Sequence, residues 1–188
     1  MRSIFIGTPA AILIWSSNIW NFGDGLLGPL FAVFAQQVGG NVLDIAWAWG
    51  AYLIVMGAGV IIVGIVSDRT AKLPILFAGY VLSTIFTFSY LVVDSTAMLL
   101  AVQAGIGIAT ALANPTYFAL LAKHSPKESD GSLWGWADGR DKIATGLAVF
   151  AGGVVVSQFG FHTLFITMGI LQLCATLYLA RLFYVRND

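Results

Sequence analysis

The stretch Trp134-Gly-Trp-Ala-Asp138-Gly-Arg140-Asp141-Lys142 places four charged residues at the front of an apolar run that continues to Val156. On a helix, spacings of three and four residues bring Trp134, Asp138, Asp141 and Lys142 onto one face. In a membrane-spanning helix, each charge costs roughly 2.5–3.5 kcal/mol at the bilayer centre. We therefore expect these charges to pair with one another and to face protein or a wet cavity.

The composition indicates an integral membrane protein. Of the 188 residues, 59% are hydrophobic and 10% are charged, whereas an ordinary soluble domain has about 25% charged residues. The single cysteine, Cys174, excludes a disulfide framework and a thiolate metal site. Basic residues are few and dispersed, so we expect no nucleic-acid partner, and no residue pattern indicates a metal or a cofactor.

Six apolar runs are long enough to cross about 30 Å of hydrocarbon. Thr8 is a candidate N-cap for the first, with Pro9 at the first helical position. The connections are short, so we predict an all-α membrane protein that forms a single six-helix bundle over residues 1–188. The runs cover approximately residues 9–35, 45–66, 74–93, 96–122, 132–157 and 163–184.

Lysine and arginine residues lie on one side of this topology. The odd-numbered connections, 36–44, 94–95 and 158–162, contain none, and within the spans only Arg140 and Lys142 are basic. The positive-inside rule then predicts cytoplasmic termini on a multi-pass protein of the plasma (cytoplasmic) membrane. The remaining basic residues occupy the termini and the even-numbered connections: Arg2, Arg69, Lys72, Lys123, Lys127, Arg181 and Arg186.

The two halves of the chain resemble each other. The pattern L-x-x-P-x-F at 26–31 recurs as L-x-x-P-x-Y at 112–117, and W-x-W at 47–49 recurs at 134–136. Each copy contains three spans, about 8–93 and about 96–184, and an odd number of crossings inverts the second copy. A three-plus-three inverted repeat is a transporter architecture.

The first span carries a lone carboxylate near its middle. Asn21, Asp24 and Gly28 share a helix face, next to the glycine-rich segment 23–25 and a kink expected at Pro29. An ionisable side chain at this depth indicates a function, because it is costly to bury.

The fourth span presents a comparable polar face. Asn114 and Tyr117 lie on it with Gln103, and we expect Pro115 to break the helical hydrogen bonds beside Asn114. For Gln103 the simpler interpretation is a hydrogen bond between helices.

Two interpretations of the fifth span remain open. In the first interpretation, the helix does not enter the membrane until Ile143. Only 17 residues then remain to Phe159, and residues 138–142 form a salt-bridge patch at the membrane interface. In the second interpretation, the repeat aligns Trp134 with Trp47 at the start of a span, which places Lys142 about 12–15 Å inside the membrane. Arg140 points away from the face that carries Asp138 and Lys142.

The second-to-third connection, Gly64-Ile-Val-Ser-Asp68-Arg69-Thr-Ala-Lys72, resembles the G-x-x-x-D-R-x-G-[RK] signature of the major facilitator superfamily, with Ala71 in place of the second glycine. The resemblance implies one half of that family's twelve-helix fold and a cytoplasmic gating role for Gly64, Asp68, Arg69 and Lys72. The family's fourth-helix arginine and fifth-helix Gly-Pro are replaced, by Ala101 and by Ala148-Val149. These departures weaken the case for proton antiport by the family's usual route.

Six helices cannot enclose a substrate path, so we expect a parallel homodimer. The resemblance implies that Asp68 caps the partner's fifth helix near residues 131–133, because a carboxylate is stabilised at a helix N-terminus.

The sequence therefore predicts a secondary active transporter and not an enzyme. Protonation of Asp24 or Asp138 would couple transport to a proton gradient, with Lys142 as counter-charge and Trp20 in an aromatic wall. The alternatives are a non-transporting scaffold or sensor, or a half-transporter that pairs with a different six-helix partner. A zwitterion, a neutral polar solute, a sugar and a lipophilic amine all remain candidate substrates. The predicted substrate or coupling residues are Asn21, Asp24, Asn114, Tyr117, Trp134, Asp138, Asp141 and Lys142.

Overall fold

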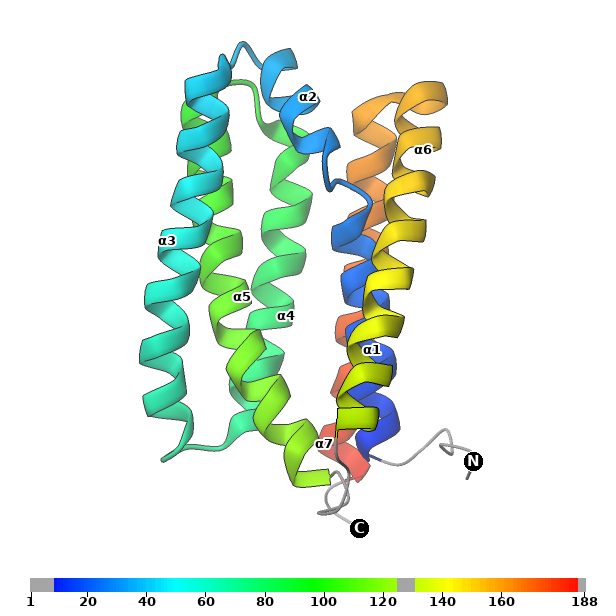
Figure 1. Ribbon diagram of the computed structural model, residues 1–188. Helices are drawn as coiled ribbons and strands as arrows, with labels where there is room; N and C mark the ends of the chain where they lie inside the picture. The colour runs from blue at the N-terminus through cyan, green and yellow to red at the C-terminus, as the bar shows by residue number, and fades with distance from the viewer. Residues whose placement is uncertain (1–8, 125–130, 186–188) are drawn as a thin grey trace.

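The computed structural model describes residues 9–124 and 131–185, and every regular element in these ranges is a helix. The long helices run nearly side by side in an upright bundle (Figure 1). In chain order the elements are α1 Pro9–Gly25, α2 Leu30–Gln37, α3 Val42–Ser67, α4 Lys72–Ser89, the 3-10 helix η1 Tyr90–Val92, α5 Thr96–His124, α6 Gly131–Ala180 and α7 Leu182–Val185.

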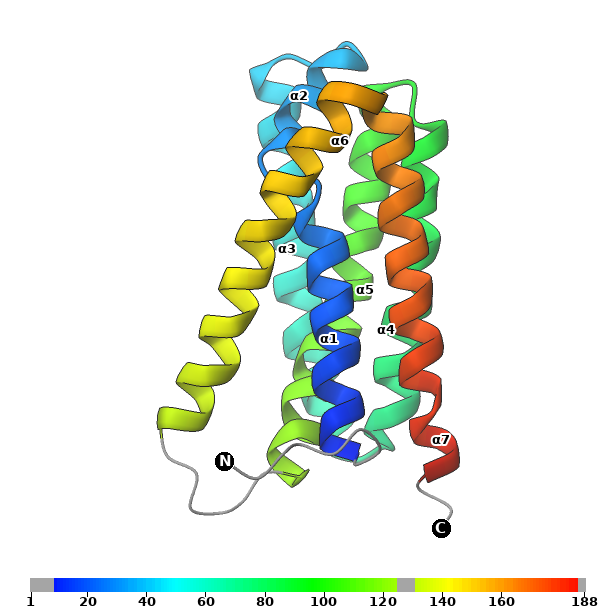
Figure 2. The same ribbon diagram turned by 90° about the vertical axis from the view of Figure 1, so that its right-hand side faces the viewer.

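Four helical segments of the described chain are long and apolar enough to cross a membrane: Val42–Ser67, Lys72–Val92, Thr96–Lys123 and Asp138–Val185. The last contains both the fifth and the sixth predicted runs. It is interrupted at Gly160, where φ is 77° and ψ is 174°, and there the chain reverses its direction (Figure 2). These segments confirm a helical membrane protein.

The first predicted run is divided between α1 and α2. α1 starts at Pro9, as expected, and ends at Gly25, while Thr8 lies outside the described residues. Pro29 has no N–H to donate to Gly25, and the Leu30 amide bonds to the Leu27 carbonyl, at 2.7 Å. Gly28 has a φ of +32°, so the glycine and the proline together end the helix.

The break expected at Pro115 is wrong, because α5 continues through this residue without interruption. The Thr116 hydroxyl donates to the carbonyls of Leu112 and Ala113, at 2.6 and 3.0 Å. The carbonyl that loses its helical donor at Pro115 is that of Ala111, four residues earlier, so the Thr116 bonds accompany the proline and do not replace the missing bond.

Polar groups fix both ends of α3. At its start, the Asn41 side chain accepts bonds from the amides of Leu43 and Asp44, and the Asp44 carboxylate accepts one from the Asn41 amide. This capping box starts the helix three residues before the predicted run. At its end, Lys72 Nζ donates to the Ser67 carbonyl at 2.7 Å, and a cation is favourable there because it opposes the helix dipole.

The helices pack in two groups, which Figure 1 shows side by side: α3, α4 and α5 in one, and α1 with α6 in the other. α4 also packs against α6 and joins the groups. Around Phe34, the rings of Tyr90, Phe161 and Phe165 lie with their centres 4.7–5.9 Å away. This aromatic core holds α2 against α6 near the reversal at Gly160.

Apart from Arg140 and Lys142, the basic residues of the described chain lie at one end of the bundle, which also carries Asp68. Asp44 and Asp94 lie at the end where α3 and α5 begin. The basic residues lie at the opposite end, where α1 begins and α7 ends (Figure 1): Arg69, Lys72, Lys123 and Arg181. This asymmetry is the one that the sequence displayed, and the side of the membrane to which each end belongs stays a prediction.

Candidate functional site

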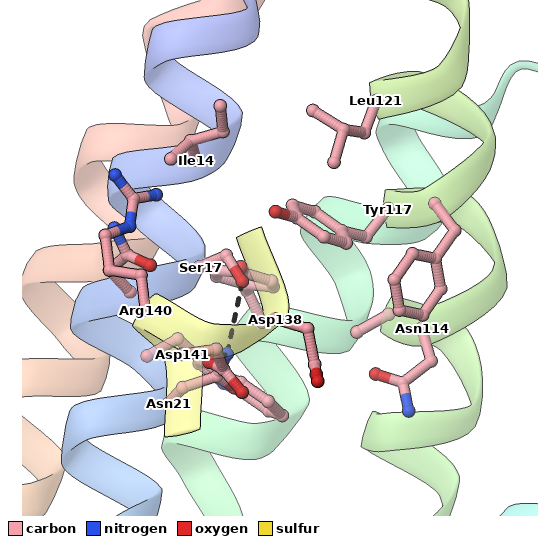
Figure 3. A pocket seen from close by; sticks show the side chains of 14 residues that line it. Ile14, Ser17, Asn21, Asn114, Tyr117, Leu121, Asp138, Arg140 and Asp141 are labelled. Atoms are coloured by element: carbon pink, nitrogen blue, oxygen red, sulfur yellow. Dashed lines mark hydrogen bonds between the residues drawn. The ribbon is translucent and has the colours of Figure 1, made fainter. Parts of the chain in front are cut away.

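A polar cavity of about 140 Å³ lies between α1, α4, α5 and the first turns of α6, and we call it the lower cavity. Figure 3 shows how side chains from α1, α5 and α6 surround the opening. Towards the end of the bundle where α1 begins, α6 diverges from α1 (Figure 2). The residues that line the lower cavity are Ile14, Ser17, Asn18, Trp20, Asn21, Tyr80, Ala113, Asn114, Tyr117, Phe118, Leu121, Asp138, Arg140 and Asp141.

The lower cavity brings together residues that the sequence had singled out on three different spans: Asn21, Asn114, Tyr117, Asp138 and Asp141. The Trp134 side chain lies outside the described part of the chain. Neither Asp24 nor Lys142 lines this cavity.

The charged cluster on α6 is linked internally and to α1. Lys142 Nζ lies 3.3 Å from Asp141 Oδ2 and 3.6 Å from Asp138 Oδ1. Asn21 Nδ2 donates to Asp141 Oδ1 and, at 3.3 Å, to Ser17 Oγ. The Asp138 and Lys142 side chains are 74% and 69% exposed, whereas Asp141 is 23% exposed. Asp141 is therefore held within the helix packing, and the Asp138–Lys142 pair lies at its open edge.

Arg140 contributes to the cavity wall, which the sequence analysis did not predict. Its guanidinium carbon lies 5.9 Å from the centre of the Trp15 ring. In Figure 3 the guanidinium lies on the side of Ile14, away from the Asp138 carboxylate. Arg140 and Asp138 thus line the same cavity, and the expectation that Arg140 points away from the face of Asp138 and Lys142 stays a prediction.

Aromatic rings form another wall of the lower cavity. Trp20 and Tyr80 stack with ring centres 5.6 Å apart and an interplanar angle of 23°, and Tyr117 lines the same space. Tyr80 was not predicted, because it lies in an apolar run of α4 with no polar neighbour in sequence. Trp20 is 8% exposed, and its Nε1 has no hydrogen-bond partner among the described residues.

A second cavity, of about 160 Å³, surrounds Asp24 at the end of α1; we call it the upper cavity. No hydrogen bond or ion pair joins the Asp24 carboxylate to any described side chain. The Tyr90 hydroxyl donates to Gln103 Oε1 at 3.1 Å, the structural role expected of Gln103. The residues that line the upper cavity are Asp24, Gly25, Leu27, Gly28, Phe31, Trp49, Tyr52, Thr87, Tyr90, Gln103, Ile106, Thr145 and Met168.

A buried polar network, which the sequence analysis missed, joins α4 to the second half of α6. Gln172 is 0% exposed, and its Oε1 accepts bonds from Ser83 and Thr87 at 2.9 and 3.0 Å. Thr84 and Thr176 share a bond at 3.2 Å nearby. The partners are separated by 85–92 residues along the chain, so no local pattern could have revealed them.

The connection between α3 and α4 leaves two of its motif side chains without a partner in the described chain. Asp68 is the C-cap of α3, and both it and Arg69 are exposed. Lys72 is instead bonded to the Ser67 carbonyl, and Ser67 Oγ donates to the Gly64 carbonyl at 3.0 Å. A carboxylate at a helix C-terminus opposes the helix dipole unfavourably, so α3 itself does not explain Asp68.

Long apolar helices around cavities lined by polar and charged side chains define a multi-pass membrane protein. The family model for the Major Facilitator Superfamily matches residues 13–188, and the chain belongs to that family. Its members are membrane transporters and not enzymes, in agreement with the sequence analysis. The chain is 25% identical over 166 residues to an uncharacterized MFS-type transporter of Methanocaldococcus jannaschii. The match covers 88% of this chain and 43% of the relative, so the chain spans less than half of that protein's length.

Proposed function

We propose that the chain is a six-helix unit of a secondary active transporter that works by alternating access, with the lower cavity as its solute site. One observation carries the proposal: carboxylates, amides and aromatic rings from four helices converge on one space inside an apolar bundle. Burying such groups in a membrane is costly, and intramembrane charges generally mark solute or ion pathways.

The transporting assembly in this proposal is a parallel homodimer. α3 supports it, because in its most apolar 18-residue window only 6% of the residues are buried by the rest of the chain. Two rows of glycines, spaced seven residues apart, also have no atom within 4 Å of where a Cβ would lie. Small residues let membrane helices approach closely. The rows are Gly50, Gly57 and Gly64 on α3, and Gly139, Gly146 and Gly153 on α6.

We further propose that the six helices form two inverted repeats with the termini in the cytoplasm of the cell. The packing of α3 on α5 and of α6 on α1 supports this arrangement. In this packing α3, the second helix of the first repeat, contacts α5, the first helix of the second repeat. The first half of α6, the second helix of the second repeat, likewise contacts α1, the first helix of the first repeat. In the dimer, Asp68 of one copy would cap the start of α6 in the other.

Coupling in this scheme depends on Asp24 or Asp138. Asp24 supports a coupling role, because its carboxylate lines a cavity separate from the solute site and has no basic residue among the lining side chains. Asp24 is exposed in the single chain, and proton binding there would remove a negative charge from this cavity while the two units rock. Asp24→Asn should therefore abolish gradient-driven accumulation and preserve solute exchange.

The transport experiment uses the purified chain in liposomes with an imposed proton gradient. A mixture of small polar solutes is offered, and the internal contents are measured by mass spectrometry. We expect at least one solute to accumulate, with Asp24→Asn reduced to exchange and Asp94→Asn as the matched control at an exposed connection. Absence of both accumulation and exchange for every solute would refute the proposed function.

Assembly is tested with two differently tagged chains in a Cys174→Ser background, one carrying Asp68→Cys and the other Leu133→Cys. A parallel homodimer should give a crosslink between the two tags. The control pair, Asp44→Cys with Leu133→Cys, joins opposite ends of the bundle and should give none. Crosslinking in the control alone would contradict the parallel arrangement.

The second candidate assembly has a different six-helix partner. It is favoured by the coverage of only 43% of the relative's length, because the remaining length could correspond to a second, non-identical unit. Co-purification of a distinct chain, with no crosslink between the two tags, would select this alternative.

A further inference from the structure

We infer that the solute of the lower cavity is a small organic monocation that carries an ammonium group, which binds to Asp138. This inference names the substrate class of the proposed transport site and therefore rests on the proposed function. It starts from the charges that line the cavity, which are two carboxylates and one guanidinium.

Among the described residues the Arg140 guanidinium forms no ion pair with either carboxylate. It lies over Trp15, at 5.9 Å, and on the side of Ile14 in Figure 3. The two carboxylates share one ammonium, that of Lys142, at 3.3 and 3.6 Å. With Arg140 the four charges of the cluster balance overall, but only the Lys142 ammonium lies within ion-pair distance of the carboxylates, and it is shared between them. An ammonium is therefore favoured close to Asp138, where an anion would be repelled.

The position of Asp138 suits a solute contact. Its side chain is 74% exposed, and its distance to Lys142, 3.6 Å, is the longer of the two ion-pair distances. In Figure 3 its carboxylate points across the opening towards Asn114. Asp141 is less accessible, because it also accepts the bond from Asn21. Asp138 is therefore the carboxylate that an ammonium can reach.

The remaining walls suit the organic part of such a cation. The stacked rings of Trp20 and Tyr80, with Tyr117, offer aromatic surface to a positively charged group, and cations are attracted to the faces of aromatic rings. The cavity of about 140 Å³ holds roughly five waters at about 30 Å³ each, which limits the solute to a small molecule.

The main rival is a zwitterion. Its carboxylate would need a donor. Trp20 Nε1 and Arg140 Nε have no hydrogen-bond partner in the described part of the chain, but both have less than 1 Å² of accessible surface and a solute does not reach them. The two Nη atoms of Arg140 are not buried in this way, so the comparison of butylammonium with 4-aminobutanoate decides between an ammonium on Asp138 alone and a zwitterion that also uses this guanidinium.

Lys142 then becomes a competitor of the solute. Its ammonium occupies the position beside Asp138 that the solute requires, and its own side chain is 69% exposed and free to leave. Removal of this ammonium should tighten the binding of a cationic solute. A purely structural role of the cluster would give the opposite sign.

The test measures binding to the purified chain in nanodiscs by isothermal titration calorimetry at pH 7. Four probes share a four-carbon chain and differ in charge: butylammonium, butanamide, butanoate and 4-aminobutanoate. We expect butylammonium to bind, with Asp138→Asn weakening it about ten- to a hundredfold, the range for a hydrogen bond to a charged group. Lys142→Gln should tighten it about two- to fivefold, the range for an exposed ion pair. Asp94→Asn should leave it unchanged.

Preference for 4-aminobutanoate, equal binding of butanamide, or equal affinities in Asp138→Asn and the unaltered chain would overturn the inference. The two proposals fail separately. Accumulation of a different solute in liposomes without butylammonium binding refutes only the inference. Asp138-dependent butylammonium binding without transport of any solute refutes only the proposed function.

Discussion

The two halves of α6, on either side of Gly160, both carry polar residues in apolar sequence and treat them in opposite ways. In the second half, Gln172 is fully buried and accepts bonds from Ser83 and Thr87. In the first half, the Asp138 and Lys142 side chains are 74% and 69% exposed beside a cavity. Gln172 Nε2 has no hydrogen-bond partner in the described part of the chain, so the Gln172 network is satisfied in part. Polar groups that bond one another across helices hold the helices together, and those left accessible are where a solute or another unit can act.

The comparison predicts that substitutions will separate stability from binding. Changes where α6 packs on α1 or α4 should lower the free energy of unfolding and leave butylammonium binding intact. Changes at the open cluster should do the reverse. Three sets of substitutions test this separation, in decreasing order of their expected effect on stability.

The largest effect is expected for Gly152→Ala. A Cβ at position 152 would overlap the carbonyl oxygen of Leu26, a backbone atom at the break that follows α1, so one of the two helices must shift. Overpacking of this kind costs about 1–3 kcal/mol. Thermal unfolding in detergent should show a clearly lowered midpoint.

The neighbouring glycine is the matched control. Nothing lies within 4 Å of a Cβ at Gly153, and alanine is favoured over glycine in a helix by up to about 1 kcal/mol. Gly153→Ala should therefore unfold at the same temperature or higher. Equal destabilisation by the two substitutions would show that the contact with Leu26 does not determine the cost.

An intermediate effect is expected for Gln172→Leu. The substitution removes the acceptor of two hydrogen bonds, and such bonds between membrane helices contribute roughly 0.6 kcal/mol each. We expect a loss of about 1 kcal/mol, with unchanged butylammonium binding. Ser83→Ala completes a double-mutant cycle, which should give a coupling of a few tenths of a kcal/mol or more. Loss of binding with unchanged stability would place Gln172 with the first half of α6 instead.

The sequence predicted the helices well where one signal dominates. Length and hydropathy placed α3, α4 and α5 to within a few residues, and the segment from Gly23 to Pro29 marked the break after α1. The break predicted at Pro115 was wrong, because α5 continues through this residue. A proline lacks a donor in every helix, and only the surroundings decide whether the helix ends.

The candidate site was predicted in part. The three-and-four spacing correctly placed Asp138 and Asp141 on one face, and the cavity adds Asn21, Asn114 and Tyr117 to them. Asp24 was expected in the same cavity, but it lines the upper cavity, at the end of α1 that follows Asn21. The depth of a residue along its own helix does not reveal which neighbouring helices face it. For the same reason, Tyr80 and Gln172 could not be recognised from sequence.

The smallest effect on stability is expected for Asp138→Asn and Lys142→Gln, the substitutions with the strongest expected effect on binding. An exposed pair at positions i and i+4 contributes about 0.3–0.5 kcal/mol, and both side chains are mostly accessible at the edge of the cavity. Unfolding midpoints should therefore stay close to that of the unaltered chain, while the affinity for butylammonium falls in one variant and rises in the other. A destabilisation of more than about 1 kcal/mol in both would exceed the contribution of an exposed pair. The cluster would then resemble the Gln172 network, a means of holding helices together, and the contrast between the two halves of α6 would no longer distinguish structure from function.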